Sequence, residues 1–223
     1  MDDEPNPAHA WFSPVRGLLA LAAIALIAST AMAAPGELVT GETAVFDAAN
    51  GLPWWVGRPL ELPMHLASSI GALLVVVAGF AARKRRVAAA GLLGWLAARF
   101  LSTLMKAAVD RPRPPGLLAD VVLRQHLPAD GGFPSSHSAI AAALAVAAGW
   151  GWRPLRAPLA LAAVAVGVAR MYVGVHLPLD LVGGWALGLL CGLAAVWIVH
   201  PRVPPHPEPA PWSRRRKVPP DVR

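Results

Sequence analysis

Residues 169–180 read A-R-M-Y-V-G-V-H-L-P-L-D, and they place an arginine, a histidine and an aspartate between two apolar runs. Charged side chains are costly to bury in a membrane, so charge at such a depth indicates a functional site. Two earlier stretches have a similar character: residues 106–114 (K-A-A-V-D-R-P-R-P) and residues 134–138 (P-S-S-H-S). The path of the chain through the bilayer determines whether these three polar stretches can meet.

The chain is rich in apolar residues and poor in charge. Of its 223 residues, 56% are hydrophobic and 15% are charged, and the mean hydropathy is +0.50. A soluble domain of this length needs more polar surface to cover its core. The apolar residues fall in blocks of roughly 18–22, the length at which a helix crosses a hydrocarbon core of about 30 Å. The composition therefore predicts an integral membrane protein.

The net charge of +7 is of a kind that attracts nucleic acid, but its distribution favours a membrane. Basic residues gather in short runs beside apolar blocks, as in Arg83–Arg86 and Arg214–Lys217. This is the positive-inside pattern of membrane proteins, so we expect a bilayer and no nucleic acid as partner. A single cysteine, Cys191, excludes both an intramolecular disulfide and a thiolate metal cluster.

Three regions are expected along the chain: a polar leader (1–16), a six-helix transmembrane domain (17–200) and a basic, disordered cytoplasmic tail (201–223). The predicted spans are residues 17–34, 63–82, 87–109, 136–152, 157–175 and 177–199. The first block ends in A-M-A-A, so a cleaved signal peptide is an alternative to a retained first helix. The acidic residues Asp2, Asp3 and Glu4 favour retention.

Six spans place both termini on one side of the membrane. We expect the protein in the plasma membrane. The basic clusters at 83–86, at 153–156 and in the tail then assign the side of the termini to the cytoplasm. The segments then expected outside are residues 35–62, 110–135 and 175–178. The predicted fold is thus all-α, a polytopic bundle of six helices with the three polar stretches at its extracytoplasmic face.

Positive charge is in excess at this face. Its cations are Lys106, Arg111, Arg113 and Arg170, and the nearby acids do not obviously neutralise them. Arginine forks bind phosphate oxygens in pairs and lysine adds a point charge, so an anionic ligand is indicated. The start of a helix at Ser135–Ser136 adds free backbone N–H groups and a positive dipole end, although Ser135 also suits a purely structural N-cap.

Two histidines complete a set of groups for phosphoryl transfer. Asp180 lies four residues after His176, so its carboxylate can reach one ring nitrogen and leave the other free to attack. His137 can donate a proton to a leaving oxygen. A zinc site built from His137, His176 and Asp180 is conceivable, but the surrounding cations would repel the metal.

These residues resemble the signature of the type 2 phosphatidic acid phosphatase superfamily of integral membrane lipid phosphatases. That signature has three parts, K-x6-R-P, P-S-G-H and S-R-x5-H-x3-D. The positions of this chain that match it in order are Lys106, Arg113, Pro114, Pro134, Ser135, His137, Arg170, His176 and Asp180. The resemblance covers roughly residues 63–199, and its joint spacing is far more specific than any one part.

The resemblance implies that His176 attacks phosphorus, Asp180 orients His176, and His137 protonates the leaving group. The phosphate-binding residues that it implies are Lys106, Arg113, Ser135, Ser136 and Arg170. It implies neither a metal nor a cofactor. Two departures weaken the match: Ser136 replaces a glycine, and Ala169 replaces a serine whose hydroxyl could support Arg170.

The expected activity is hydrolysis of a lipid phosphate or diphosphate through a phosphohistidine intermediate. Substrates of the polyprenyl diphosphate, phosphatidic acid and phosphatidylglycerol phosphate types are all open. One alternative is a phosphotransferase that passes the phosphoryl group to an acceptor alcohol. Another is a transporter or a silent scaffold, but transporters carry midplane sites and inverted repeats, which this sequence lacks. The sequence does not determine the oligomeric state.

Overall fold

The computed structural model describes residues 7–199, and every regular element in this range is helical. The α-helices are α1 (Pro7–Ala33), α2 (Glu42–Asn50), α3 (Trp54–Leu66), α4 (Ser69–Ala81), α5 (Arg85–Val109), α6 (Ser136–Gly151), α7 (Arg156–Tyr172) and α8 (Pro178–Val199). Short 3-10 helices occupy Pro114–Gly116 and Arg153–Leu155. The all-α class is confirmed for this part of the chain, whereas the predicted tail 201–223 lies outside it. The first helix takes in residues 7–16 of the expected leader.

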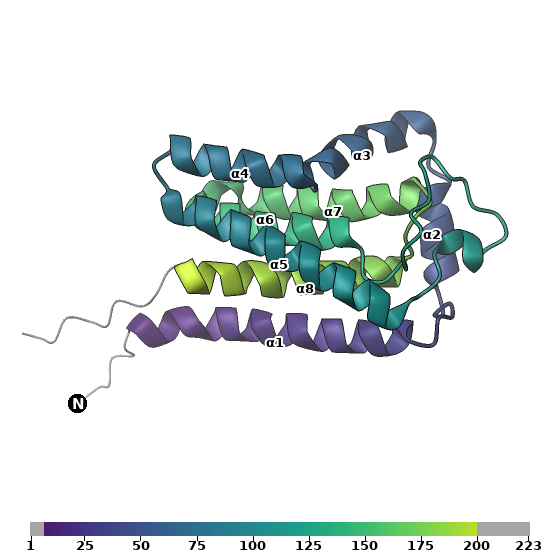
Figure 1. Cartoon of the computed structure of the whole chain (residues 1–223), viewed down its shortest axis with the longest axis horizontal. Helices are drawn as coiled ribbons and strands as arrows, with labels where there is room; N and C mark the ends of the chain where they lie inside the picture. Colours follow the sequence, from purple (N-terminus) through teal and green to yellow (C-terminus); the bar gives the residue numbers. More distant parts are fainter. Residues whose placement is uncertain (1–6, 200–223) are drawn as a thin grey trace, which may run out of the picture.

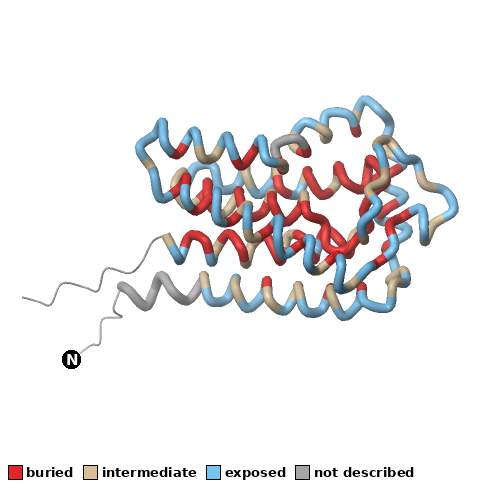
Figure 2. Tube along the Cα trace, in the orientation of Figure 1, coloured by how far each residue is buried: buried red, intermediate tan, exposed pale blue. Residues whose placement is uncertain are grey.

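The long helices lie side by side, with α1 and α8 on one side of the bundle and α3 and α4 on the other (Figure 1). Buried residues follow α6 and α8 through the centre of the molecule, as Figure 2 shows. The outward faces carry large exposed apolar side chains, among them Ile24, Ile27, Leu73 and Phe80. Such continuous apolar exposure is what a helix surface in contact with lipid requires.

The second span differs from its prediction, because two helices replace the single helix expected over 63–82. Helix α3 ends at Leu66, α4 begins at Ser69, and the two axes meet at 55°. The Ser68 hydroxyl accepts a hydrogen bond from the Ile70 backbone N–H at 3.2 Å and caps α4. Because Ser68 lies within an apolar run, it is not recognisable from the sequence as the start of a helix. At 13 residues, α4 alone is about 20 Å long and does not cross a bilayer.

Four helical stretches of the described chain are long and apolar enough to cross a membrane, and the bent α3–α4 pair makes a possible fifth. The stretches are Val15–Ala33, Arg85–Gly116, Arg153–Tyr172 and Pro178–Val199. The fourth predicted span corresponds to α6, which has only 16 residues. The predicted fifth span ends early at Tyr172, because Gly174 adopts a φ of 84° and turns the chain. Six spans therefore stay a prediction.

Three glycines of α8, spaced by four residues, let α6 approach very closely. A Cβ atom at Gly188 would lie 2.1 Å from the backbone oxygen of Ala139. At Gly184 it would lie 2.6 Å from the Ser135 oxygen, and at Gly192 it would lie 2.9 Å from the Ala143 oxygen. Small residues at this spacing are typical of helix contacts in membranes. This contact sets the first turn of α6 beside the first turn of α8.

Helix α2 and the loop over residues 110–135 cover one end of the bundle (Figure 1). The buried Asn50 at the end of α2 ties these parts to α7. Its side-chain amide donates to the backbone oxygens of Val122, Met171 and Tyr172, and its side-chain oxygen accepts from the Val122 N–H. The long connection predicted over 110–135 is confirmed, and these bonds hold it against the bundle.

Candidate active site

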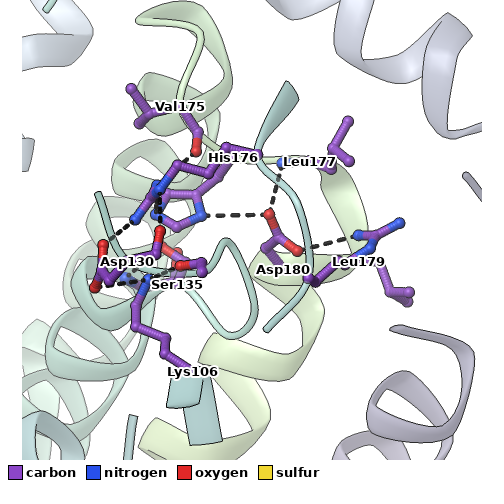
Figure 3. A network of polar contacts seen from close by, with 12 residues as sticks. Lys106, Asp130, Ser135, Val175, His176, Leu177, Leu179 and Asp180 are labelled. Carbon is purple, nitrogen blue, oxygen red and sulfur yellow. Dashed lines mark hydrogen bonds and ion pairs between the residues drawn. The ribbon is translucent and has the colours of Figure 1, made fainter. Parts of the chain in front are cut away.

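His176 and Asp180 form a buried pair where α7 gives way to α8 (Figure 3). The turn at Gly174 ends α7, and Pro178 in the first turn of α8 restarts the helix. His176 Nδ1 lies 3.3 Å from Asp180 Oδ2, which also accepts the Leu177 N–H at 2.9 Å. A carboxylate can only accept, so Nδ1 carries the proton and Nε2 keeps its lone pair.

The free nitrogen of His176 points toward positive charge. Its Nε2 lies 3.4 Å from Nη1 of Arg113. Burial, followed by the charges of Lys106, Arg170 and Arg113, holds the pKa of His176 well below its ordinary value. The ring is therefore neutral at neutral pH, with a lone pair available to an electrophile.

Lys106 and Arg113 share one anionic partner, the half-exposed carboxylate of Asp130. Arg113 Nη2 donates to Asp130 Oδ1 at 2.7 Å, and Lys106 Nζ lies 3.4 Å from Asp130 Oδ2. Partial burial opposes ionisation, but the hydrogen bond from Arg113 and the charge of Lys106 bring the pKa of Asp130 below its ordinary value. Two nearly buried cations thus already hold one oxyanion beside His176 (Figure 3).

Arg170 lies in the last turn of α7 and is also almost fully buried. Its Nη1 donates to the side-chain oxygen of Gln125 at 3.1 Å and lies 3.2 Å from Met64 Sδ. No carboxylate among residues 7–199 forms an ion pair with Arg170, and its buried Nε has no hydrogen-bond partner there. A buried cation with neutral partners has unused capacity for an anion.

The start of α6 borders the same space. Ser135 is buried as the N-cap, and its hydroxyl accepts from the Ser138 N–H at 3.4 Å, so the structural role expected for it is present. The Ser136 hydroxyl accepts a hydrogen bond from Ser102 of α5 at 2.9 Å. Ser136 is the first residue of α6, and the first N–H groups of a helix have no partner within the helix. The ring of His137 is partly exposed and makes no hydrogen bond to another described residue. It lies within electrostatic range of the positive charge of Arg170.

The structure therefore brings all three predicted polar stretches to one end of the bundle. The predicted residues it gathers there are Lys106, Arg113, Ser135, Ser136, His137, Arg170, His176 and Asp180. No three His, Cys, Asp or Glu side chains of the described chain are arranged to hold a metal ion, so the zinc alternative finds no ligand set there.

Sequence reasoning missed Glu42 and gave Arg111 no specific role. Arg111 is fully buried and donates to Asp180 Oδ1 at 3.1 Å and to both carboxylate oxygens of Glu42. Glu42 lies 69 residues before Arg111, in a segment of four acids that no motif marks. The single available signal was the excess of acids over bases in residues 35–62.

Comparison with known proteins gives a consistent result. The sequence pattern of the PAP2 superfamily matches residues 87–204, just over half of the chain and a range that contains all eight predicted site residues. An undecaprenyl-diphosphatase of Sulfolobus acidocaldarius is 30% identical over 121 residues, which are 52% of this chain and 57% of that protein. The chain thus matches little more than half the length of this curated relative.

Two solved structures share the fold. One is a transmembrane PAP2 type phosphatidylglycerolphosphate phosphatase from Bacillus subtilis, with a TM-score of 0.62 and 24% identity over 77% of this chain and 92% of that one. The other is LpxE of Aquifex aeolicus, with a TM-score of 0.60 and 26% identity over 72% of this chain and 97% of that one. Both alignments extend well beyond the three polar stretches.

Proposed function

Because this chain belongs to the PAP2 superfamily, we propose that it is an integral membrane phosphatase that hydrolyses a lipid phosphate or diphosphate. One observation carries the proposal: the unprotonated Nε2 of His176 faces buried cations that hold a carboxylate where a phosphate would fit. Polyprenyl diphosphate, phosphatidic acid and phosphatidylglycerol phosphate are the candidate substrate types. Transfer to an acceptor alcohol is the alternative outcome for the same intermediate.

In the proposed reaction, His176 Nε2 attacks phosphorus while the bond from phosphorus to the leaving oxygen breaks. Asp180 holds the Nδ1 proton and stabilises the positive charge that the ring acquires. His137 gives a proton to the leaving oxygen, then takes one from the water that hydrolyses the phosphohistidine. The transferring oxygens are held by Lys106, Arg113, Arg170 and the N-terminus of α6.

Purified protein is expected to release inorganic phosphate from a lipid phosphate in the presence of a chelator, because the cations in this mechanism are side chains. Vanadate should inhibit, since it mimics phosphate at the transition state. A panel of the three candidate substrate types, assayed side by side in detergent, checks both points. Activity that disappears with chelator and returns with zinc would contradict the metal-free mechanism. Phosphate found on an added alcohol would identify a transferase, and the absence of any turnover would favour a transporter or scaffold.

An apolar cavity of about 210 Å³ between α4, α6 and α7 suits the substrate's hydrocarbon tail. Its lining includes Pro63, Gly71, Ala141, Leu144, Leu159 and Val166. Pro63 of this lining directly precedes Met64, whose sulfur lies 3.2 Å from Arg170 Nη1. A lipid with its phosphate on Arg170 could therefore lay its first chain segments along this cavity.

Filling the cavity with Ala141→Phe is expected to raise KM for a long-chain substrate about 10-fold, the cost of losing one to two buried methylenes. A short-chain, water-soluble phosphate ester should keep its KM, because its headgroup contacts are unchanged. Ala78→Phe, at an exposed position of α4, is the matched control. Equal effects on both substrates would place the tail elsewhere.

We also propose that six segments cross the membrane, with α6 and the α3–α4 pair as two of them, and that the site faces outward. The three-region organisation of leader, membrane domain and cytoplasmic tail follows from this topology. The basic residues at 83–86 and 153–156 support it. Asp120→Cys lies in the exposed loop and should react with an impermeant thiol reagent added to intact cells, whereas the native Cys191 is buried. If the cysteine reacts only after the cells are opened, the orientation is the opposite of the one proposed.

A further inference from the structure

We infer that the buried pair of Glu42 and Arg111 is a positioning device that holds Asp180, and through it His176, in the geometry that phosphoryl transfer needs. The inference rests on the proposed function. It assigns a role to Glu42, which lies outside the three-part signature, and to Arg111, which occupies an unspecified position within its first part. It also gives a purpose to α2, whose first residue is Glu42.

Arg111 and Arg113 approach the histidine–aspartate pair from opposite ends. A single residue, Pro112, separates the two arginines in the sequence. Arg113 Nη1 lies 3.4 Å from His176 Nε2, whereas Arg111 Nη1 lies 3.1 Å from Asp180 Oδ1. One arginine faces the attacking atom and the other faces the far side of the carboxylate that supports it.

Every oxygen of the two carboxylates is engaged. Asp180 gives Oδ2 to His176 and Leu177 and Oδ1 to Arg111. Glu42 binds Arg111 with both oxygens and also accepts the backbone N–H groups of Val39 at 2.9 Å and Leu179 at 3.0 Å. Leu179 immediately precedes Asp180, so Glu42 fixes both the backbone and the counter-ion of that residue.

The charges of the cluster suit the proposed reaction. Two carboxylates and one guanidinium leave one net negative charge beside His176, which matches the single positive charge that the ring gains when Nε2 forms its bond to phosphorus. Without Glu42, the charge of Arg111 would cancel that of Asp180, and no net negative charge would remain to stabilise the positive charge on the His176 ring. Without Arg111, two buried carboxylates would repel each other and one would take up a proton.

A buried ion pair can also act on stability alone, so the test must separate the two roles. We expect Glu42→Gln to lower kcat about 10- to 100-fold, as loss of an orienting partner does, with KM changed less than about threefold. In an Asp180→Asn background the same substitution should cost less than about twofold, because a group that acts through Asp180 has nothing left to act on. Release of radiolabelled phosphate at high enzyme concentration keeps the residual rates measurable.

Glu37→Gln removes an equal charge from an exposed side chain near α2 and is the matched control for Glu42→Gln. Thermal unfolding in detergent is measured on every variant. If Glu42→Gln does not fold, Arg111→Lys replaces it in the comparison with and without Asp180→Asn. Lysine keeps the positive charge but lacks the paired N–H groups of the guanidinium. Equal losses in both backgrounds, or unchanged kcat in folded Glu42→Gln, would overturn the inference. Full turnover in Asp180→Asn alone would instead overturn the mechanism under the proposed function.

Discussion

Replacing His176 by alanine is expected to lower turnover of a lipid phosphate by at least about 1,000-fold, because the proposed pathway has no other nucleophile. The fold should survive, since within residues 7–199 the ring's polar contacts are with Asp180 and Arg113, and both of these keep further partners. Phosphate release measures the loss. A radiolabel that stays on the native protein in base but is lost in acid, and that is absent from the variant, would identify the phosphohistidine.

His126→Ala is the appropriate control for this experiment. His126 lies exposed in the loop over residues 110–135, and we expect its alanine variant to keep native turnover. A folded His176→Ala protein that retains more than about a tenth of the native rate would remove His176 as the nucleophile. The surviving cations would then point to a different attacking group, such as water activated by His137.

Gly188→Ala is expected to damage the protein severely, although it adds only one methyl group. The new Cβ would lie 2.1 Å from the Ala139 backbone oxygen and 2.7 Å from the Ala142 Cβ, and a backbone atom cannot rotate away. Helices α6 and α8 would have to separate, at a cost on the order of 3 kcal/mol or more. We expect reduced yield, a lower unfolding temperature in detergent and strongly reduced turnover, because Ser135 and His137 would move away from His176.

Gly94→Ala tests whether this effect is specific to the α6–α8 contact. Gly94 lies in α5 and faces the same two helices, but an added Cβ would make only ordinary contacts, at 3.6 Å from Ala143 Cβ and 3.7 Å from Ala195 Cβ. Near-native stability is expected for this variant. If Gly188→Ala is equally stable, the close approach of α6 and α8 is not required for the fold.

The helical class and the grouping of the predicted site residues could be derived from the sequence for clear physical reasons. Apolar blocks of spanning length are obligatory in lipid, and charge within them is rare enough to stand out. The spacing between His176 and Asp180 is local, so one helical turn brings the two side chains together. The prediction that the polar stretches share one face rested on a count of six spans, which stays a prediction, and on the position of the basic clusters.

Features that depend on distant contacts could not be derived in this way. Glu42 contacts Arg111, which lies 69 residues later in the chain, and no motif near Glu42 indicates this partner. The break between α3 and α4 depends on Ser68, a weak signal within a strongly apolar run. The role of Asp130 was hidden similarly, because an acid in a loop ordinarily faces water, whereas here it bridges Lys106 and Arg113.

The glycine contact of α8 has a consequence for how such a protein can diversify. It holds the start of α6, with Ser135 and His137, close against α8, which carries Asp180, whereas α4 supplies Gly71, Leu74 and Val75 to the lining of the apolar cavity. Substitutions at these α4 positions can alter the fit of a hydrocarbon chain without displacing His176 or Asp180. If the proposed function holds, chemistry and substrate choice are expected to be separable by mutation, so that a protein that keeps α6 and α8 can adopt new lipids through changes in α4.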